Sequence, residues 1–331
     1  ETGLERSHCS HILTQPGGLD SSLLGIAAME PQTMSTDARR DGHSPTISFE
    51  FFPPKSPAAA TALWQSVERL APLGPRFVSV TYGAGGTTRE RTMAAILAIR
   101  ERARLDVAGH LTCVGASRAE VMKVARGYAR LGCRRIVALR GDPPSGEGAF
   151  APHVDGFSGS VELVEALARE GGFQIFVGAY PEIHPEAADV AADVEHLKRK
   201  IDAGATAAIT QFFFEPEMFL RFRDRAAAAG IDAPIIPGIL PVDDFDKMAR
   251  FAARCGTTVP DWMHTAFGNC ETDEEHELLA TAIATELADR LIEEGTGHLH
   301  VYTLNKPDLP MRLCRALGLE AAPIGVAASC G

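Results

Sequence analysis

The sequence lacks the features that define several classes of protein. Its seven cysteines include no Cys-x-x-Cys pair and no cluster with histidine at zinc-ligand spacing, so a structural zinc site is not expected. An odd and scattered set of cysteines is typical of reduced thiols, which predicts a cytoplasmic protein. No apolar run approaches the roughly 20 residues that a membrane-spanning helix requires, and no secretory signal pattern occurs.

Long basic segments and a dinucleotide-binding fingerprint are missing as well. The formal net charge is −11, and no run of lysine and arginine is long enough to track a phosphate backbone. We therefore do not expect nucleic acid as a partner. No Gly-x-Gly-x-x-Gly sequence follows the first predicted strand, so a nucleotide cofactor would not be held as it is in a Rossmann fold.

The composition that remains is that of a globular α/β protein. The chain has 331 residues, of which 45% are hydrophobic and 23% charged, which suits one large domain or two ordinary ones. Residues 1–45 are polar and without periodicity, which predicts a disordered leader or extension, with Met29 or Met34 as the natural start. We expect a catalytic domain over residues 46–320 and a tail over residues 321–331.

Short apolar runs alternate regularly with helical patterns from residue 46 onward. Strands are predicted at residues 47–52, 77–81, 108–113, 135–139, 173–179, 207–211, 235–238 and 298–302. Helices are predicted at residues 57–71, 88–104, 117–131, 160–170, 187–203, 215–229, 242–255 and 309–317, with an extra helix at 271–294 before the last strand. Eight such units predict a single-domain (β/α)₈ barrel. A doubly wound open sheet is the alternative, although it usually has fewer repeats.

Glu50 is the most informative single residue, because catalytic groups of such barrels come from the carboxyl ends of the strands. It stands between Phe49 and Phe51 in the first strand. Burial disfavours a charged carboxylate, so we expect the pKa of Glu50 to be raised. A carboxylic acid that is protonated near neutral pH can act as a general acid. The alternative is a strand residue that faces water or pairs with an arginine.

Polar residues also follow the other predicted strands. Arg140, Gly141 and Asp142 end the fourth strand, and a fixed negative charge at Asp142 would stabilise a cation that forms in the site. The alternative for Asp142 is an ordinary turn cap. His110 is either a site residue or a core histidine. Gln211 offers a donor and an acceptor to a heterocycle, or else makes a structural hydrogen bond.

A glycine-rich loop and one helix face complete the candidates. The run from Gly83 to Gly86 would let the backbone approach a flat ligand or a phosphate. Asp193 and Lys200 share a face of the predicted helix 187–203, and Arg199 is adjacent. On spacing alone, a solvated helix face explains this helix equally well.

Eight short stretches occur in an order that resembles one protein family. They are Ser48–Pro54, Val78–Ala84, His110–Cys113, Leu139–Asp142, Tyr180–Pro185, Ala208–Phe214, Ile235–Pro241 and Tyr302–Asn305. Together they resemble methylenetetrahydrofolate reductase in its bacterial short form, over about residues 46–318. The resemblance implies a flavin-binding (β/α)₈ barrel, in agreement with the alternation of strands and helices.

The resemblance also implies a reaction. NADH would reduce FAD, and the reduced flavin would convert 5,10-methylenetetrahydrofolate to 5-methyltetrahydrofolate for methionine synthesis, with ping-pong kinetics in a cytoplasmic homo-oligomer. One alternative is another flavin-barrel oxidoreductase that resembles proline dehydrogenase, against which Gln211 argues. Another is a non-catalytic folate- or flavin-binding subunit, against which the presence of both Glu50 and Asp142 argues. The sequence does not decide between NADH and NADPH.

The family's functional residues fall on specific positions of this chain. The general acid falls on Glu50, and the aspartate that favours the cationic intermediate falls on Asp142. The residues expected to bind FAD are Tyr82, Ala84, His110, Arg140, Gly141, Asp142, Ser160, Tyr180, His184, Asp193, Arg199 and Lys200. The residues expected to bind the substrates are Thr81, Gln211, Phe251 and Lys306.

The chain departs from the family pattern in two respects. Position 306 is lysine where the family usually has arginine, so a bidentate contact to a substrate carboxylate or phosphate is in doubt. The leader over residues 1–45 has no counterpart in the short form. Because the chain ends soon after the barrel, we expect neither the regulatory domain of the longer eukaryotic form nor feedback by adenosylmethionine.

Overall fold

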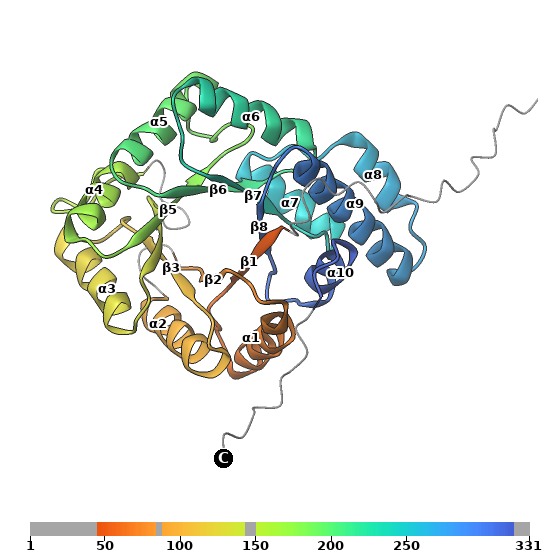
Figure 1. The fold of residues 1–331 in the computed structure, drawn as a ribbon, viewed down its shortest axis with the longest axis horizontal. Helices are drawn as coiled ribbons and strands as arrows, with labels where there is room; N and C mark the ends of the chain where they lie inside the picture. Colours follow the sequence, from red (N-terminus) through yellow and green to blue (C-terminus); the bar gives the residue numbers. More distant parts are fainter. Residues whose placement is uncertain (1–44, 84–87, 143–149, 321–331) are drawn as a thin grey trace, which may run out of the picture. The chain divides into compact units, whose positions relative to one another are not determined.

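The computed structural model describes residues 45–83, 88–142 and 150–320. Its eight parallel strands pair in chain order, and β1 pairs with β8 to close a barrel (Figure 1). The strands are β1 (Thr46–Phe51), β2 (Phe77–Val80), β3 (Val107–Thr112), β4 (Arg135–Leu139), β5 (Gln174–Ala179), β6 (Ala207–Phe212), β7 (Ile235–Ile239) and β8 (His298–Tyr302). The predicted (β/α)₈ barrel is confirmed.

A ring of helices surrounds the strands (Figure 1). The helices are α1 (Pro57–Leu70), η1 (Ala71–Leu73), α2 (Arg89–Ala98), η3 (Ile99–Ala103), α3 (Arg118–Arg130), α4 (Ser160–Glu170), α5 (Val190–Asp202), α6 (Pro216–Ala228), α7 (Phe245–Cys255), α8 (Asp261–Gly268), α9 (Asp273–Glu293) and α10 (Asp308–Ala316). None of the helices in these ranges is long and apolar enough to cross a membrane.

The extra helix predicted before the last strand is α9, whose first turn is fixed by a capping box between Thr272 and Glu275. The structure adds α8, which the sequence did not predict. This helix has eight residues, begins after Pro260 without a side-chain cap, and buries only Met263 and Phe267. A single pair of apolar residues four apart is too short a pattern to indicate a helix.

Two apolar layers hold the barrel together. One lies between the strands and the surrounding helices, as expected for strands that are covered on the outer side. The other is a cluster that includes Phe77 of β2, Val137 of β4, Phe176 of β5 and Ile236 of β7. The rings of Phe77 and Phe176 lie 5.0 Å apart. These side chains fill part of the barrel, so the openings that could hold ligands lie at its ends.

Candidate active site

Two adjacent pockets lie at the carboxyl ends of the strands. The first, which we call the rim pocket, has a volume of about 300 Å³ and is lined by residues that include Glu50, His110 and Gln211. The second, the flanking pocket, has a volume of about 540 Å³ and lies at the ends of β4 and β5, the start of α4 and one face of α5. Leu139, Gly178 and Tyr180 line both pockets, so a single elongated ligand could occupy them together.

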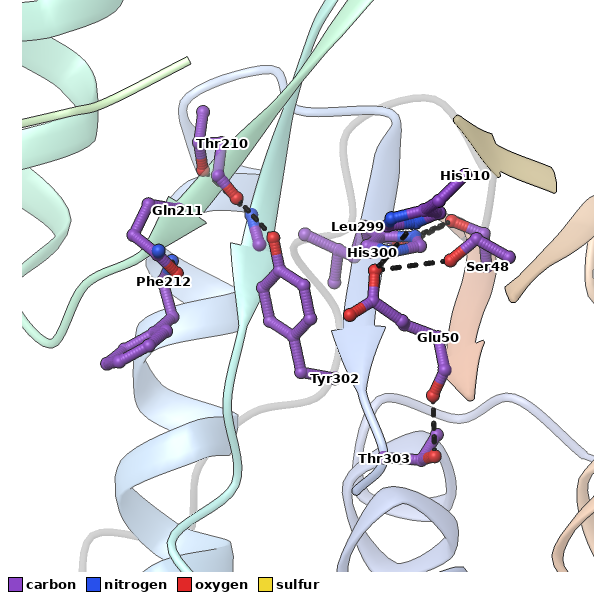
Figure 2. A network of polar contacts seen from close by, with 12 residues as sticks. Ser48, Glu50, His110, Thr210, Gln211, Phe212, Leu299, His300, Tyr302 and Thr303 are labelled. Atoms are coloured by element: carbon purple, nitrogen blue, oxygen red, sulfur yellow. Dashed lines mark hydrogen bonds and ion pairs between the residues drawn. The ribbon is translucent and has the colours of Figure 1, made fainter. Parts of the chain in front are cut away.

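Glu50 lines the rim pocket, and its side chain points from β1 toward His110 and His300 (Figure 2). Its Oε2 atom lies 3.1 Å from Nε2 of His110 and 3.7 Å from Nε2 of His300. The hydroxyl of Ser79 donates a longer hydrogen bond of 3.3 Å to the same oxygen. With 14% of its side chain exposed, Glu50 is a nearly buried carboxylate that faces two imidazole rings.

The expected rise in the pKa of Glu50 is wrong in direction. Burial does raise the pKa, but the charge and the hydrogen bond of His110, together with the nearby His300, outweigh burial and lower it to about 2. The phenylalanines beside Glu50 in the sequence indicated desolvation correctly. The histidines come from β3 and β8, and the local sequence of β1 gives no sign of them.

The backbone around Glu50 is fixed by the loop that follows β8. The hydroxyl of Thr303 donates a hydrogen bond of 2.6 Å to the carbonyl of Glu50 (Figure 2). The side-chain amide of Asn305 accepts a hydrogen bond of 2.8 Å from the N–H of Phe52 and donates one of 3.0 Å to the carbonyl of Phe52. Leu304 and Asn305 have φ angles of 50° and 59°. Such left-handed geometry is costly for leucine and is often found at functional sites.

Gln211 reaches the rim pocket because β6 is irregular there. The pairing of β6 with β7 shifts register between Ile209 and Phe212, and a bulge of this kind changes the direction of a side chain. The Gln211 Oε1 atom accepts a hydrogen bond of 3.1 Å from the N–H of Phe212. This bond leaves the amide NH₂ as a donor toward the rim pocket (Figure 2).

Aromatic and hydroxyl groups form the rest of the rim pocket. Phe251 of α7 is 36% exposed, and its ring stacks on Phe212 with the centroids 5.4 Å apart. Thr81 and Tyr82 follow β2, and both line the pocket. Tyr302 of β8 donates from its hydroxyl to the carbonyl of Thr210 over 2.6 Å. Aromatic faces around a small polar floor suit a flat heterocycle.

The Arg140-Gly141-Asp142 turn lies at the edge of the flanking pocket. The guanidinium of Arg140 forms a bidentate ion pair with Glu186. Gly141 has a φ angle of 84°, and a Cβ atom there would lie 2.6 Å from Val114, so only glycine fits. Asp142 is exposed and lines this pocket rather than the rim pocket. The two predicted catalytic carboxylates therefore lie in neighbouring pockets.

Tyr180 and His184 follow β5, and their rings pack edge to face with the centroids 4.5 Å apart. The Asp193 carboxylate accepts a hydrogen bond of 2.9 Å from the backbone N–H of His184. The Nδ1 atom of His184 accepts from the N–H of Glu186 over 3.0 Å, and burial lowers the pKa of this ring. A neutral His184 therefore carries its proton on Nε2. Burial, followed by the charge of Asp142, raises the pKa of Tyr180 to about 12, so its hydroxyl stays protonated.

Basic groups of α5 lie at the far side of the flanking pocket. Lys200 is buried, and its Nζ atom donates a hydrogen bond of 2.6 Å to the carbonyl of Gly178. Burial lowers its pKa to about 8, against the attraction of Asp193. Arg199 contacts Nδ1 of His196 at 3.0 Å. Among the residues that the structure describes, Lys200 has no carboxylate at bonding distance, and such a buried ammonium group is suited to bind an anion.

The N-terminus of α4 provides neutral donors at the same pocket. Ser160 is its first residue, and the preceding Gly159 supplies no side-chain cap. The first N–H groups of a helix have no partner within the helix and favour negative charge. Since residues 158–160 line the flanking pocket, these N–H groups add to the positive potential of Arg199 and Lys200.

The structure brings most of the predicted site residues together. The rim pocket holds Glu50, Thr81, Tyr82, His110, Tyr180, Gln211 and Phe251. The flanking pocket holds Arg140, Gly141, Asp142, Ser160, Tyr180, His184, Asp193, Arg199 and Lys200. Ala84 lies outside the described residues. Lys306 lines neither pocket, and its ammonium group forms an ion pair with Asp243.

Several residues of the site were not predicted from the sequence. Glu186 and His196 line the flanking pocket, and Tyr302 lines the rim pocket. Ser48 and His300 lie deeper, beneath Glu50. A signal for Ser48 was available, because residues two apart on a strand share one face and Ser48 precedes Glu50 by two.

Comparison with known proteins gives a consistent result. A family model described as methylenetetrahydrofolate reductase matches residues 35–318. A Pectobacterium carotovorum protein named 5,10-methylenetetrahydrofolate reductase is 46% identical over 275 residues, which cover 83% of this chain and 90% of that protein. The Escherichia coli protein of the same name is 45% identical over 275 residues, which cover 83% of this chain and 91% of that protein.

A plant relative and one solved structure extend the comparison. An Arabidopsis thaliana protein named methylenetetrahydrofolate reductase (NADH) 1 is 32% identical over 285 residues, which cover 82% of this chain and 48% of that protein. A Clostridium thermocellum protein that binds two copies of 5-methyl-5,6,7,8-tetrahydrofolic acid has a TM-score of 0.53 at 18% identity, with 84% of this chain and 96% of that one covered. The structural likeness shows a shared fold.

Proposed function

Because this chain belongs to the methylenetetrahydrofolate reductase family, we propose that it is an enzyme that reduces 5,10-methylenetetrahydrofolate to 5-methyltetrahydrofolate. The observation that carries the proposal is the rim pocket. It combines a buried carboxylate at Glu50, a free amide donor at Gln211 and an exposed aromatic ring at Phe251. These groups match a pterin, which has a flat face and a polar edge.

The flanking pocket fits FAD, the cofactor that we propose. Its basic groups, Arg199 and Lys200, and the uncapped N-terminus of α4 suit a pyrophosphate. Asp193 suits the hydroxyls of a ribityl chain, and Tyr180 lies where the two pockets meet. Bound FAD would supply hydride transfer between the two substrates. We further propose that NADH is the hydride donor, as the name of the Arabidopsis relative indicates for that protein, and that the kinetics are ping-pong.

Glu50 would protonate the folate at N10 as the five-membered ring opens. In the ligand-free protein Glu50 is ionised at neutral pH, because its pKa is about 2. A bound substrate that excludes water from the rim pocket makes the charged carboxylate of Glu50 less favourable, so its pKa rises. The proton then lies on the carboxyl oxygen, where it can be donated. Asp142, at the tip of β4, would favour the 5-iminium cation electrostatically.

The visible spectrum of the purified protein under anaerobic conditions tests the proposal. We expect a flavin absorbance band that bleaches when NADH is added and returns when methylenetetrahydrofolate follows. Methyltetrahydrofolate should form in an amount equal to the flavin that is reoxidised. A protein that remains colourless after incubation with FAD would contradict the cofactor, and a bleached band that folate does not restore would contradict the reaction.

A further inference from the structure

A line of polar side chains runs through the barrel between β1 and β8. Thr46 pairs with His298, Ser48 with His300, and Glu50 with Tyr302 in the parallel register of these strands. Residues two apart on a strand point to the same face, and the side chains of Ser48, Glu50 and His300 meet inside the barrel (Figure 2). We call Thr46, Ser48, His298 and His300 the polar seam.

The members of the polar seam contact one another in sequence. Oγ1 of Thr46 lies 2.6 Å from Nδ1 of His298, and Nε2 of His298 lies 2.9 Å from Oγ of Ser48. The same Ser48 oxygen lies 2.7 Å from Nδ1 of His300. A hydroxyl between two imidazoles can accept a hydrogen bond from one ring and donate a hydrogen bond to the other. The seam is therefore continuous from Thr46 to His300.

The end of the polar seam nearest the rim pocket is His300, which faces Glu50. His300 is fully buried, and its Nε2 atom is one of three buried side-chain atoms without a hydrogen-bond partner in the described part of the chain. That atom lies 3.7 Å from Oε2 of Glu50, slightly beyond hydrogen-bond distance. An unsatisfied buried nitrogen is costly, and here a small movement of the Glu50 carboxylate would satisfy it.

The other end of the polar seam, at Thr46 and His298, reaches solvent at the amino-terminal end of the barrel. Thr46 is exposed, and His298 lines a pocket of about 430 Å³ that also includes Arg76 and Thr296. This pocket lies at the amino-terminal ends of the strands, opposite the rim pocket. Burial lowers the pKa of His298 to about 3, as do the neighbouring His300 and Arg76. His298 is therefore neutral near pH 7, so it has one nitrogen that donates and one that accepts.

The proposed reaction needs such a connection. Each turnover consumes one folate, one NADH and one proton, and the proton must come from water. The other groups that face Glu50 are His110, Ser79 and Tyr302. His110 and Tyr302 line the rim pocket, so bound substrates cover them. Ser79 is fully buried, and in the described part of the chain its hydroxyl bonds only Glu50. Among these contacts, the polar seam is therefore the one that leads from Glu50 to solvent away from the rim pocket.

We propose that the polar seam delivers the proton that Glu50 donates, from solvent at the amino-terminal end of the barrel. This inference rests on the proposed function. A hydronium ion at the amino-terminal end of the barrel gives a proton to the hydroxyl of Thr46 and leaves as water, and Thr46 passes its own hydroxyl proton to Nδ1 of His298. His298 then passes its Nε2 proton to Ser48. Ser48 passes its hydroxyl proton to Nδ1 of His300, and His300 passes its Nε2 proton to the Glu50 carboxylate. One proton enters and one leaves, and each imidazole holds the same number of protons before and after, with its proton moved to the other ring nitrogen.

The test separates the two half-reactions in the FAD-loaded protein, with Ser48→Ala as the main variant. Rapid mixing measures flavin reduction by NADH, which needs no proton, and flavin reoxidation by folate, which needs one. We expect reoxidation to slow by roughly 10- to 100-fold, less than the full contribution of about 10²- to 10⁴-fold from a general acid. Reduction by NADH should stay unchanged. Reoxidation in the unaltered protein should depend non-linearly on the deuterium fraction of the solvent, and linearly in Ser48→Ala.

A second variant and a matched control guard against a packing effect. His298→Gln keeps a polar side chain at the solvent end of the polar seam but cannot relay a proton. It should therefore slow flavin reoxidation by folate and leave flavin reduction by NADH unchanged. Thr285→Val removes a hydroxyl on α9 that has no partner in the described part of the chain, and it should change neither half-reaction. In cofactor-free protein, imidazole N–H signals of His298 and His300 should be protected from exchange, and Ser48→Ala should remove that protection.

The outcomes separate this inference from the proposed function. Unchanged reoxidation in both Ser48→Ala and His298→Gln would overturn the relay while leaving the reductase intact. An equal loss in both half-reactions would show that the polar seam acts only through packing, which also overturns the relay. If the unaltered protein carries out neither half-reaction, the proposed function fails and the relay fails with it.

Discussion

The rim pocket and the flanking pocket are neighbours that share Leu139, Gly178 and Tyr180, yet they are built differently. The rim pocket contains one carboxylate, Glu50, and is otherwise lined largely by aromatic, hydroxyl and amide groups. The flanking pocket is lined by three basic groups and by three carboxylates. The rim pocket holds a single carboxylate beside His110, whereas the flanking pocket distributes many charges around a larger opening.

This difference separates chemistry from binding. A buried carboxylate surrounded by histidines has a strongly shifted pKa, so a change at Glu50 acts on proton transfer. A group of basic residues and helix N–H donors acts on an anion that does not react, so changes there act on affinity. Substitutions in the two pockets should therefore affect different measurements.

The largest expected effect is that of Glu50→Gln in the rim pocket. The amide keeps the size of the side chain but cannot donate a proton as an acid, so flavin reoxidation by methylenetetrahydrofolate should slow by about 10²- to 10⁴-fold. Flavin reduction by NADH should remain within about twofold of the unaltered rate. Stopped-flow absorbance under anaerobic conditions measures both. Glu217→Gln, on the exposed side of α6, is the matched control, and equal rates for the two variants would remove Glu50 from the mechanism.

Lys200→Met should change binding and leave chemistry alone. Loss of a charged hydrogen-bond donor to a phosphate costs about 1.5–3 kcal/mol, so FAD affinity should fall by roughly 10- to 150-fold. The rate of flavin reoxidation at saturating FAD should not change. Equilibrium titration of the cofactor-free protein measures the affinity. Lys198→Met, on the same helix and paired with Asp202, should bind FAD normally, and similar losses in both variants would contradict a specific role for Lys200.

Lys200 should also make the unfolding free energy depend on pH, which comparison with Lys200→Met can show. The pKa of Lys200 is lowered to about 8 from its ordinary value of 10.5, so the unfolded chain binds more protons than the folded protein between these values. The unfolding free energy of cofactor-free protein should therefore rise with pH across that window, by up to about 3 kcal/mol. The difference between unaltered protein and Lys200→Met, measured by urea unfolding at several pH values, should show this slope. A constant difference would indicate that Lys200 is not buried as a cation.

The fold could be predicted from the sequence because its signals are local. Each strand is an apolar run and each helix a periodic pattern, so β1 to β8 and α9 were found within a few residues. The short α8 was missed because eight residues carry too little pattern.

The site was only partly predictable, because its chemistry depends on residues that are distant in sequence. Glu50 could be identified, but its pKa is set by His110 and His300, which lie 60 and 250 positions away on β3 and β8. The sequence placed Asp142 on the same rim, as the structure does, but it could not show that Asp142 lies in the flanking pocket and Glu50 in the rim pocket. Barrel closure brings β8 beside β1, and no local pattern reports which side chains then meet.

Phe251→Ala should have a moderate effect, which falls on substrate binding in the rim pocket and leaves FAD binding in the flanking pocket unchanged. The ring stacks on Phe212 and is 36% exposed at the mouth of the rim pocket. An aromatic contact of this kind contributes about 0.5–1.5 kcal/mol, so the KM values for both substrates should rise by roughly 2- to 10-fold, with FAD affinity unchanged. Steady-state kinetics with each substrate varied in turn measure this. An effect on one substrate alone would contradict a shared site in the rim pocket.

The smallest expected effect is that of Lys306→Ala. Lys306 is exposed, lines neither pocket, and forms an ion pair with Asp243. Exposed pairs contribute at most about 1 kcal/mol, so the KM for methylenetetrahydrofolate should change by less than roughly fivefold and kcat should not change.

Asp243→Asn provides the converse test at this position. Asp243→Asn removes the carboxylate that pairs with Lys306 and keeps the charge of the lysine. If Lys306 contacts an anionic part of the folate, the KM for methylenetetrahydrofolate should fall slightly. Lys306→Arg should lower it further, because a guanidinium binds a carboxylate in two places. If all three variants match the unaltered protein, position 306 lies outside the folate site, and substrate recognition is confined to the rim pocket.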